Sequence, residues 1–218
     1  MTGALASLTS LTEALGLIIS PRQAEALLDY LALLRRWNST YNLTAVRDPG
    51  AMLIQHLADC LAIVPAVRRE LPAGRLLDVG SGGGLPGVVL AIMLPTLAVT
   101  CVDAVGKKAA FIRQAAGTLG LSNLQAAHAR VQTLRSGPFD LITCRAFACL
   151  ADFTAWTAPL LALGGRWLAM KGKSPAAEVA ALPTAVEVFH VEHLRIPQLD
   201  AERCLVWMRP APTLDTPR

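Results

Sequence analysis

A glycine-rich segment that follows a short apolar run constrains the fold of this chain more than any other feature. Residues 78–87 read DVGSGGGLPG, and the apolar run before them begins at Arg75. Glycine lets a backbone turn sharply and approach a ligand without a Cβ in the way. Pro86 is typical of a first helical turn, where free N–H groups present a partial positive charge. The sequence therefore predicts a strand, a ligand-binding loop and a helix in direct succession.

Strands and helices alternate after residue 72. We expect strands at 75–79, 97–102, 124–127, 139–144 and 165–170, and helices at 86–94, 105–119 and 150–163. Two further strands, Val186–Arg195 and Arg203–Arg209, predict an antiparallel hairpin at one edge of the sheet. This alternation predicts an α/β fold with a doubly wound, mostly parallel seven-stranded sheet that helices cover on both faces.

The first 72 residues read as a helical extension of this α/β domain. Ser20 and Pro21 are a suitable cap and first turn for a helix. Apolar residues then recur at the spacing of one helix face, at Leu27, Leu28, Leu31, Leu34 and Trp37. A polar segment at 38–49 separates this helix from a second one at 50–69. We expect an extension at 1–72 and an α/β domain at 73–218, packed as one compact unit.

Composition and charge exclude several classes of protein. With 53% hydrophobic residues, the 218-residue chain can bury a substantial core. The uncharged run Val79–Val102 is interrupted by glycines and two prolines, so we expect no transmembrane segment. The N-terminus lacks the pattern of a signal peptide, which predicts a cytoplasmic protein. The five cysteines have no metal-site spacing, so we expect no metal, and the net charge of +4 fits a polyanionic partner without establishing one.

Two ligand patterns overlap in the glycine-rich segment. Residues 82–87 satisfy the G-x-G-x-x-G pattern of dinucleotide-binding loops, whereas residues 78–84 read D-x-G-x-G-x-G, with an acid closing the strand. Asp103 ends the next strand, 19 residues after Gly84, where a carboxylate can accept hydrogen bonds from both ribose hydroxyls. These residues predict a cofactor that contains adenosine, and they leave a nicotinamide dinucleotide and S-adenosylmethionine both open.

Further motifs extend the second pattern into a resemblance that covers residues 27–209. They are Trp37–Thr44 (W-N-x-x-Y-N-L-T), His56–Asp59 (H-L-x-D), Asp78–Gly87, Phe139-Asp140 with Arg145-Ala146, and Lys171-Gly172. With these motifs the chain resembles the bacterial 16S rRNA guanine-N7 methyltransferases, also called glucose-inhibited division protein B. It departs from the usual family residues, serine, glutamate and lysine, at Cys60, Gln132 and Arg209.

This resemblance implies a Rossmann-like class I methyltransferase fold and an S-adenosylmethionine cofactor. The implied reaction is methyl transfer to N7 of guanosine 527, in the 530 loop of 16S rRNA, by a cytoplasmic monomer that recognises this rRNA or the small ribosomal subunit. Guanine N7 carries an available lone pair, so we expect no general base.

The resemblance also implies roles for individual residues. The cofactor-binding set is Asp78, Gly80, Gly82, Gly84, Leu85, Asp103, Val131, Gln132 and Arg145. Within it, Asp78 would hold the methionine amino group and Asp103 the ribose, while Val131 and Gln132 would border the adenine. Arg145 would lie over the reaction pocket and position substrate and cofactor, unless it pairs with a carboxylate such as Asp140 or Asp152.

Several basic residues are candidates for an RNA-facing surface. The main ones are Arg36, Arg47, Lys107, Lys171 and Arg203, with Arg35, Lys108 and Lys173 as further members. His56 has no metal ligands at suitable spacing, so we expect a hydrogen-bonded structural histidine. The residues alone leave two other functions open, a nicotinamide-dependent oxidoreductase and a methyltransferase that acts on a small molecule or a protein.

Overall fold

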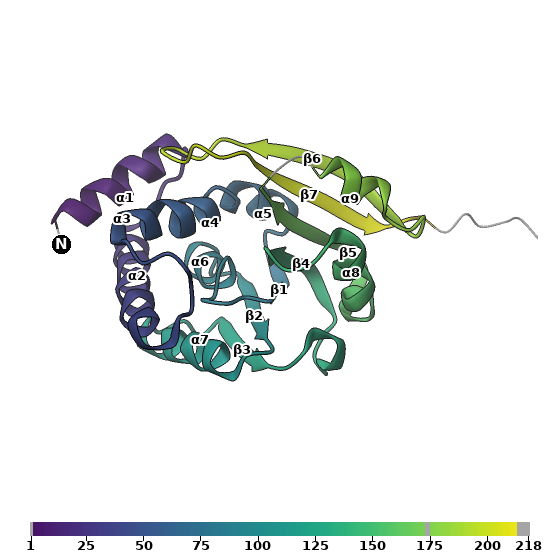
Figure 1. The fold of residues 1–218 in the computed structure, drawn as a ribbon, viewed down its shortest axis with the longest axis horizontal. Coiled ribbons are helices and arrows are strands. Elements are labelled where there is room, and N and C mark those ends of the chain that lie inside the picture. The colour runs from purple at the N-terminus through teal and green to yellow at the C-terminus, as the bar shows by residue number, and fades with distance from the viewer. Residues whose placement is uncertain (1, 173–174, 213–218) are drawn as a thin grey trace, which may run out of the picture.

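The computed structural model describes residues 2–172 and 175–212, and its centre is a seven-stranded sheet (Figure 1). The strands are β1 (Gly74–Val79), β2 (Leu97–Asp103), β3 (Leu124–His128), β4 (Phe139–Arg145), β5 (Leu161–Lys171), β6 (Val186–Leu194) and β7 (Arg203–Pro210). Their order in the sheet is β3-β2-β1-β4-β5-β7-β6. The first five strands of this order are parallel, and β7 is antiparallel to both of its neighbours. The predicted sheet and its edge hairpin are confirmed.

Helices cover both faces of this sheet, and two separate apolar clusters form beneath them. Before the sheet come α1 (Thr2–Ala14), α2 (Pro21–Tyr41), α3 (Pro49–Met52), the π-helix η1 (Leu53–Ala58), α4 (Asp59–Leu61) and α5 (Val64–Glu70). Later come α6 (Gly87–Met93), α7 (Gly106–Thr118), the 3₁₀ turns η2 (Val131–Thr133) and η3 (Ala158–Leu160), α8 (Leu150–Thr157) and α9 (Ala176–Ala180). Leu76 packs with α2, α4, α6 and α7, whereas its neighbour Leu77 packs with α8 on the opposite face. Alternate strand residues thus supply the two cores.

Helix α2 begins as the sequence predicts and packs against the glycine-rich loop. Ser20 caps it in a reciprocal capping box with Gln23. The predicted apolar face is confirmed, because its five residues lie in the core or pack against it, and Tyr30 and Asn38 are buried beside them. The Tyr30 hydroxyl donates a 2.5 Å hydrogen bond to the carbonyl oxygen of Gly83 in the loop. The N-terminal helices therefore help to shape the loop that follows β1.

Two predicted helices differ from the structure for identifiable reasons. The helix expected at 50–69 contains a π-helical stretch, Leu53–Ala58, that widens one turn. The helix expected at 150–163 ends at Thr157, and β5 begins at Leu161. Gly164, which falls between the expected helix and the expected strand at 165–170, lies within β5 with a φ of 75°, where the register with β4 shifts. The strand therefore begins earlier than predicted and contains a bulge, which the local sequence did not reveal.

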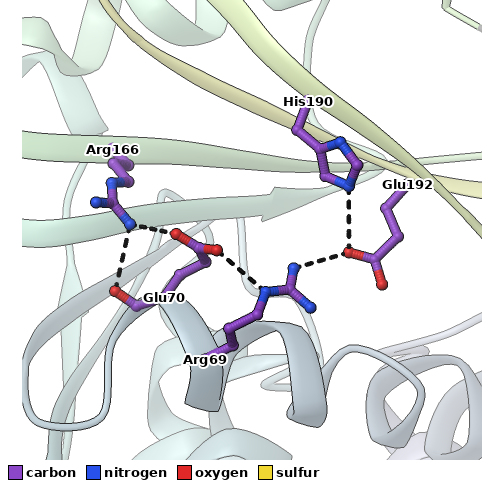
Figure 2. A network of polar contacts seen from close by, with 5 residues as sticks. All are labelled: Arg69, Glu70, Arg166, His190 and Glu192. Atoms are coloured by element: carbon purple, nitrogen blue, oxygen red, sulfur yellow. Dashed lines mark hydrogen bonds and ion pairs between the residues drawn. The ribbon is translucent and has the colours of Figure 1, made fainter.

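A network of ion pairs at the surface connects the end of α5 with β5 and β6 (Figure 2). Arg166 of β5 pairs with the Glu70 carboxylate, and Arg69 bridges Glu70 and Glu192 of β6 at 3.1 and 3.0 Å. His190 lies 3.8 Å from Glu192. Exposed ion pairs contribute little stability singly, so we regard this network as fixing the position of α5 rather than as a main source of stability.

One helical run among the described residues is long and apolar enough to cross a membrane. It extends from Pro49 to Glu70, and 67% of its most apolar window is buried inside the protein. The core helix of a soluble protein passes the same test. The uncharged run Val79–Val102 instead forms the end of β1, the glycine-rich loop, α6 and most of β2.

We predict that Tyr30→Phe loosens the glycine-rich loop. The substitution leaves the Gly83 carbonyl without its buried donor, so the free energy of unfolding should fall by about 1–2 kcal/mol. Denaturant unfolding measures this loss. Tyr41→Phe is the matched control, because Tyr41 is exposed and should tolerate the change. Equal stability of the two variants would contradict the role assigned to the Tyr30 hydroxyl.

Candidate cofactor and substrate site

The glycine-rich loop is shaped by hydrogen bonds to the end of β2. The amides of Gly80 and Ser81 donate to the Val102 carbonyl at 2.9 and 3.2 Å. Gly80 has a φ of 67°, and a Cβ there would lie 2.5 Å from Cδ2 of Phe147. Glycine is required at this position both for the left-handed backbone and for the close approach of the Phe147 ring.

The Asp103 carboxylate connects the loop with the start of α7. Its Oδ2 accepts from the Gly82 amide at 2.9 Å, and its Oδ1 accepts from the Val105 amide at 2.8 Å. Lys108 lies 3.8 Å from the same carboxylate. The side chain is buried except at its edge, and it borders a cavity. A carboxylate in this position can also accept hydrogen bonds from a ligand's hydroxyl groups.

A cavity of about 200 Å³ lies at the carboxyl ends of β1 and β2. Four of the residues predicted to bind a cofactor line it: Gly80, Asp103, Val131 and Gln132. The other lining residues are Val79, Val102, Ala104, Ala129, Arg130, Phe147 and Trp156. Ligands of open α/β sheets bind at this end of the strands, beside the point where strand order reverses. In this sheet the strand order reverses between β1 and β4, which are neighbours.

Four predicted cofactor residues are not among those that line the cavity: Asp78, Gly82, Gly84 and Leu85. Asp78 is fully buried, and its Oδ2 accepts from the Gly87 amide at 2.9 Å. Burial raises the pKa of Asp78 to about 6, against the hydrogen bond from Gly87. Its Oδ1 and the Oγ1 of Thr143, the paired residue on β4, have no hydrogen-bond partner in the part of the chain described. Two unsatisfied oxygens at paired positions mark a place for a donor, such as an ammonium group or a water.

Phe147 is a cavity residue that the sequence analysis missed. The backbone after β4 turns through Ala146, which has a φ of 49°, and this turn places Phe147 against the loop. Its ring makes edge contacts with Trp156 and Phe153, at centroid distances of 5.8 and 6.5 Å. The available signal was the position of an aromatic residue just after a strand's carboxyl end, where ligands bind.

Arg145 does not line the cavity but joins a polar cluster beside it. Its Nη1 donates to Oδ2 of Asp59 at 3.1 Å and to the Gln55 carbonyl at 3.2 Å. Arg203 donates from Nε to the other oxygen of Asp59 at 2.9 Å. The carboxylate partner of Arg145 is therefore Asp59, and neither Asp140 nor Asp152. The sequence signal for Asp59 was an acid within an apolar helix, which needs a partner when buried.

The RNA-binding candidates divide between two places. Lys171, Arg203 and Arg145 lie at the same end of three neighbouring strands, because β5 pairs with β4 on one side and with β7 on the other. Lys171 is paired with Glu178 at 2.8 Å. The exposed candidates lie on α2, on the loop after it and at the start of α7, and they are Arg35, Arg36, Arg47 and Lys107. Lys108 is half-buried beside Asp103, and Lys173 lies outside the described residues.

His56 is the hydrogen-bonded structural histidine that we expected. Its Nε2 lies 2.7 Å from the hydroxyl of Thr44, which also accepts from the Val46 amide. Burial, assisted by the nearby Arg145 charge, lowers the pKa of His56 to about 4. Among residues 2–172 and 175–212 there is no group of three or more His, Cys, Asp or Glu side chains that could hold a metal ion.

We predict that His56 makes the stability of the protein depend on pH between about 4 and 6.5. The unfolded chain binds the His56 proton more readily in this window, so the free energy of unfolding should fall as pH decreases, by about 3 kcal/mol in total. His56→Gln should remove this part of the dependence, and His193→Gln, at an exposed site, should retain it. Parallel profiles for wild type and His56→Gln in denaturant unfolding would contradict the assignment.

Comparison with known proteins places this arrangement in a family. Residues 23–206 match the family of rRNA small subunit methyltransferase G. The chain is 63% identical over 207 residues to ribosomal RNA small subunit methyltransferase G of Acidovorax sp. (strain JS42), covering 90% of this chain and 91% of the relative. The relative of the same name from Leptothrix cholodnii is 58% identical over 200 residues, with coverages of 91% and 92%.

Solved structures with lower sequence identity share the fold. The N-methyltransferase NodS from Bradyrhizobium japonicum WM9, in complex with S-adenosyl-L-homocysteine, matches with a TM-score of 0.58 at 15% identity, covering 84% of this chain and 98% of that one. TrmN from Thermus thermophilus matches with a TM-score of 0.56 at 22% identity, covering 69% and 48%. The sheet is therefore that of a class I methyltransferase, and the chain belongs to the rRNA small subunit methyltransferase G family.

Proposed function

We propose that this protein transfers a methyl group from S-adenosylmethionine to N7 of guanosine 527 in 16S rRNA. The observation that carries the proposal is the cavity between Gly80, Asp103 and Gln132, which lies at the same end of the sheet as the cationic cluster at Arg145. Family membership supports the rRNA substrate. It also sets aside the nicotinamide-dependent oxidoreductase that the sequence left open. The monomeric state and cytoplasmic location are part of this proposal.

The residues of the cavity fit an adenosyl cofactor. Gly80 contributes backbone to the lining, and Asp103 offers acceptors for ribose hydroxyls. Val131 and Gln132 supply an apolar wall and an amide for an adenine ring. Outside the cavity lining, the unpaired Oδ1 of the buried Asp78 is a further acceptor, and it suits an ammonium group such as that of the methionine part.

The proposed reaction needs positioning rather than acid–base chemistry. When bound, S-adenosylmethionine supplies a methyl group that is activated by the sulfonium. Guanine N7 already has a lone pair to attack it, so no residue has to remove a proton. The chain's contribution is to align the base with the methyl group and to exclude water, and Phe147 with Trp156 forms an apolar wall suited to that.

On this proposal, the RNA is recognised at the end of the strands where Arg145 and Arg203 lie. The exposed cations on α2, the following loop and α7 extend the positive surface, since Arg36, Arg47 and Lys107 are all exposed. Phosphate contacts of this kind supply affinity and make it depend on salt. Arg145 would thus act on the substrate side of the cavity.

We predict that Gly80→Ala abolishes tight binding of the cofactor. A Cβ at Gly80 would strike the Phe147 ring, so either the ring or the loop must move into the cavity. S-adenosylhomocysteine affinity, measured by calorimetry, should fall by at least roughly tenfold, or about 1.4 kcal/mol. Gly120→Ala is the matched control, because Gly120 also has a positive φ of 63° but open space around its Cβ. Its loss should be confined to stability, and a similar loss of affinity in both variants would contradict the steric argument.

We predict that the purified protein forms 7-methylguanosine in small ribosomal subunits that lack the modification. The product can be quantified by mass spectrometry after digestion of the rRNA. Asp103→Asn should reduce it by at least about tenfold through loss of cofactor affinity, because the ionised carboxylate strengthens hydrogen bonds to ribose. Asp200→Asn, at an exposed position, should leave it unchanged. Cofactor binding without 7-methylguanosine, from subunits or from stripped rRNA, would overturn the rRNA substrate.

A further inference from the structure

We propose that Asp59 is a positioning residue that holds Arg145 and Arg203 together as a single phosphate-binding site for the rRNA backbone beside the target nucleotide. This inference rests on the proposed function, because the phosphate belongs to the substrate of that reaction. The cluster is defined by Asp59, Arg145 and Arg203, and we refer to it as the arginine pair with its bridging carboxylate.

Asp59 is placed where a carboxylate is unfavourable without cationic partners. It is 4% exposed, and its helical neighbours Leu57, Ala58, Cys60 and Leu61 are fully buried. The carboxylate divides its two oxygens between two arginines, with Oδ2 on Arg145 and Oδ1 on Arg203. Burial of a charge is costly unless it is paired in this way, and buried ion pairs are weak sources of stability. A role in function therefore accounts for this bridge better than a role in stability.

The bridge unites two arginines that come from distant parts of the sequence. Arg145 ends β4 and Arg203 begins β7, and β5 lies between these two strands in the sheet. Each guanidinium is fixed by a second bond, from Arg145 to the Gln55 carbonyl at 3.2 Å and from Arg203 to the Glu202 carbonyl at 2.9 Å. Asp59 supplies the contact that both share, so it sets the position of one arginine relative to the other.

The arginine pair retains donors and charge for an anionic ligand. The hydrogen bonds described for residues 2–172 and 175–212 use only Nη1 of Arg145, and Nε and Nη1 of Arg203. A guanidinium has five N–H donors in a planar fork. The side chains are 21% and 25% exposed, so the cluster reaches solvent. One carboxylate between two guanidiniums leaves a single positive charge in excess, and planar forks of this kind match the oxygens of a phosphate.

The nearby Lys171 does not compete for this role. Its ammonium donates to Glu178 at 2.8 Å and to the Ala148 carbonyl at 3.1 Å, so its charge is already balanced. Arg145 lies two residues before Phe147, with the turn at Ala146 between them, and this short segment connects the arginine pair with the cavity wall. A phosphate bound by the pair would thus fix the RNA close to the reacting base.

Asp59→Asn separates positioning from simple electrostatics. Asparagine offers one acceptor oxygen and one NH₂ group, so one of the two guanidiniums loses its partner. The substitution also removes a negative charge, and charge alone would then make RNA binding tighter. If Asp59 positions the arginines, turnover should instead fall. The rate at saturating small subunits should fall about 10- to 100-fold, because misplacement of a substrate by 1 Å has effects of this size.

The experiment compares wild type, Asp59→Asn and Asp59→Glu in the kinetics of methyl transfer to small subunits (kcat and KM), in rRNA affinity by filter binding, and in S-adenosylhomocysteine affinity. We expect kcat to fall in Asp59→Asn, with rRNA affinity unchanged or tighter and cofactor affinity within about twofold. Asp59→Glu keeps two acceptor oxygens and should restore part of kcat. Glu187→Gln is the matched control. It weakens an exposed ion pair between Glu187 of β6 and Arg209 of β7, and it should leave the kinetics and both affinities unchanged.

Two results would overturn the inference. An unchanged kcat in Asp59→Asn would show that the carboxylate only neutralises charge, and a parallel loss of cofactor affinity would make Asp59 a support of the cavity. If Asp59→Asn does not fold, Arg203→Lys tests the same claim, since it keeps the charge but removes the planar fork, and it should lower kcat at unchanged rRNA affinity. No product from the wild type would instead refute the proposed function, and this inference with it.

Discussion

The rest of the site depends on the contact between the Asp103 carboxylate and the glycine-rich loop. The Asp103 carboxylate, at the end of β2, accepts hydrogen bonds from the amides of Gly82 and Val105. The carbonyl of its neighbour Val102 accepts hydrogen bonds from the amides of Gly80 and Ser81. The loop therefore takes its shape from the neighbouring strand. Left-handed glycines alone would permit many loop conformations, and these hydrogen bonds select one.

The N-terminal helices complete this arrangement from the other side of the loop. Tyr30 of α2 binds the Gly83 carbonyl, and a Cβ at Gly83 would lie 3.0 Å from the Leu34 side chain. The π-helical turn and α4 then bring Asp59 to the ends of β4 and β7. The helices before the sheet thus contribute both to the cofactor cavity and to the proposed substrate side. This connection gives a physical role to Asp59, the acid of the H-L-x-D motif.

The sequence was sufficient for features that depend on local pattern. Glycine spacing, the acid at Asp103 and the alternation of strands and helices predicted the order of the elements and two residues of the cavity lining, Gly80 and Asp103, whereas Val131 and Gln132 came from the family resemblance. It was insufficient where distant segments meet. The wall formed by Phe147, the bridge at Asp59 and the bulge at Gly164 all depend on contacts between residues far apart in the chain. Asp78 is a further difference, because it is fully buried, accepts from the Gly87 amide and does not line the cavity.

The central claim is that the cavity at the ends of β1 and β2 holds the adenosyl cofactor. The most direct measurement is a crystal structure of the protein grown with saturating S-adenosylhomocysteine. We predict ligand density in this cavity, with the ribose hydroxyls within hydrogen-bond distance of Asp103 and the adenine between Val131 and Gln132. Ligand density elsewhere, with the Phe147 ring still closed on Gly80 and the cavity unfilled, would contradict it.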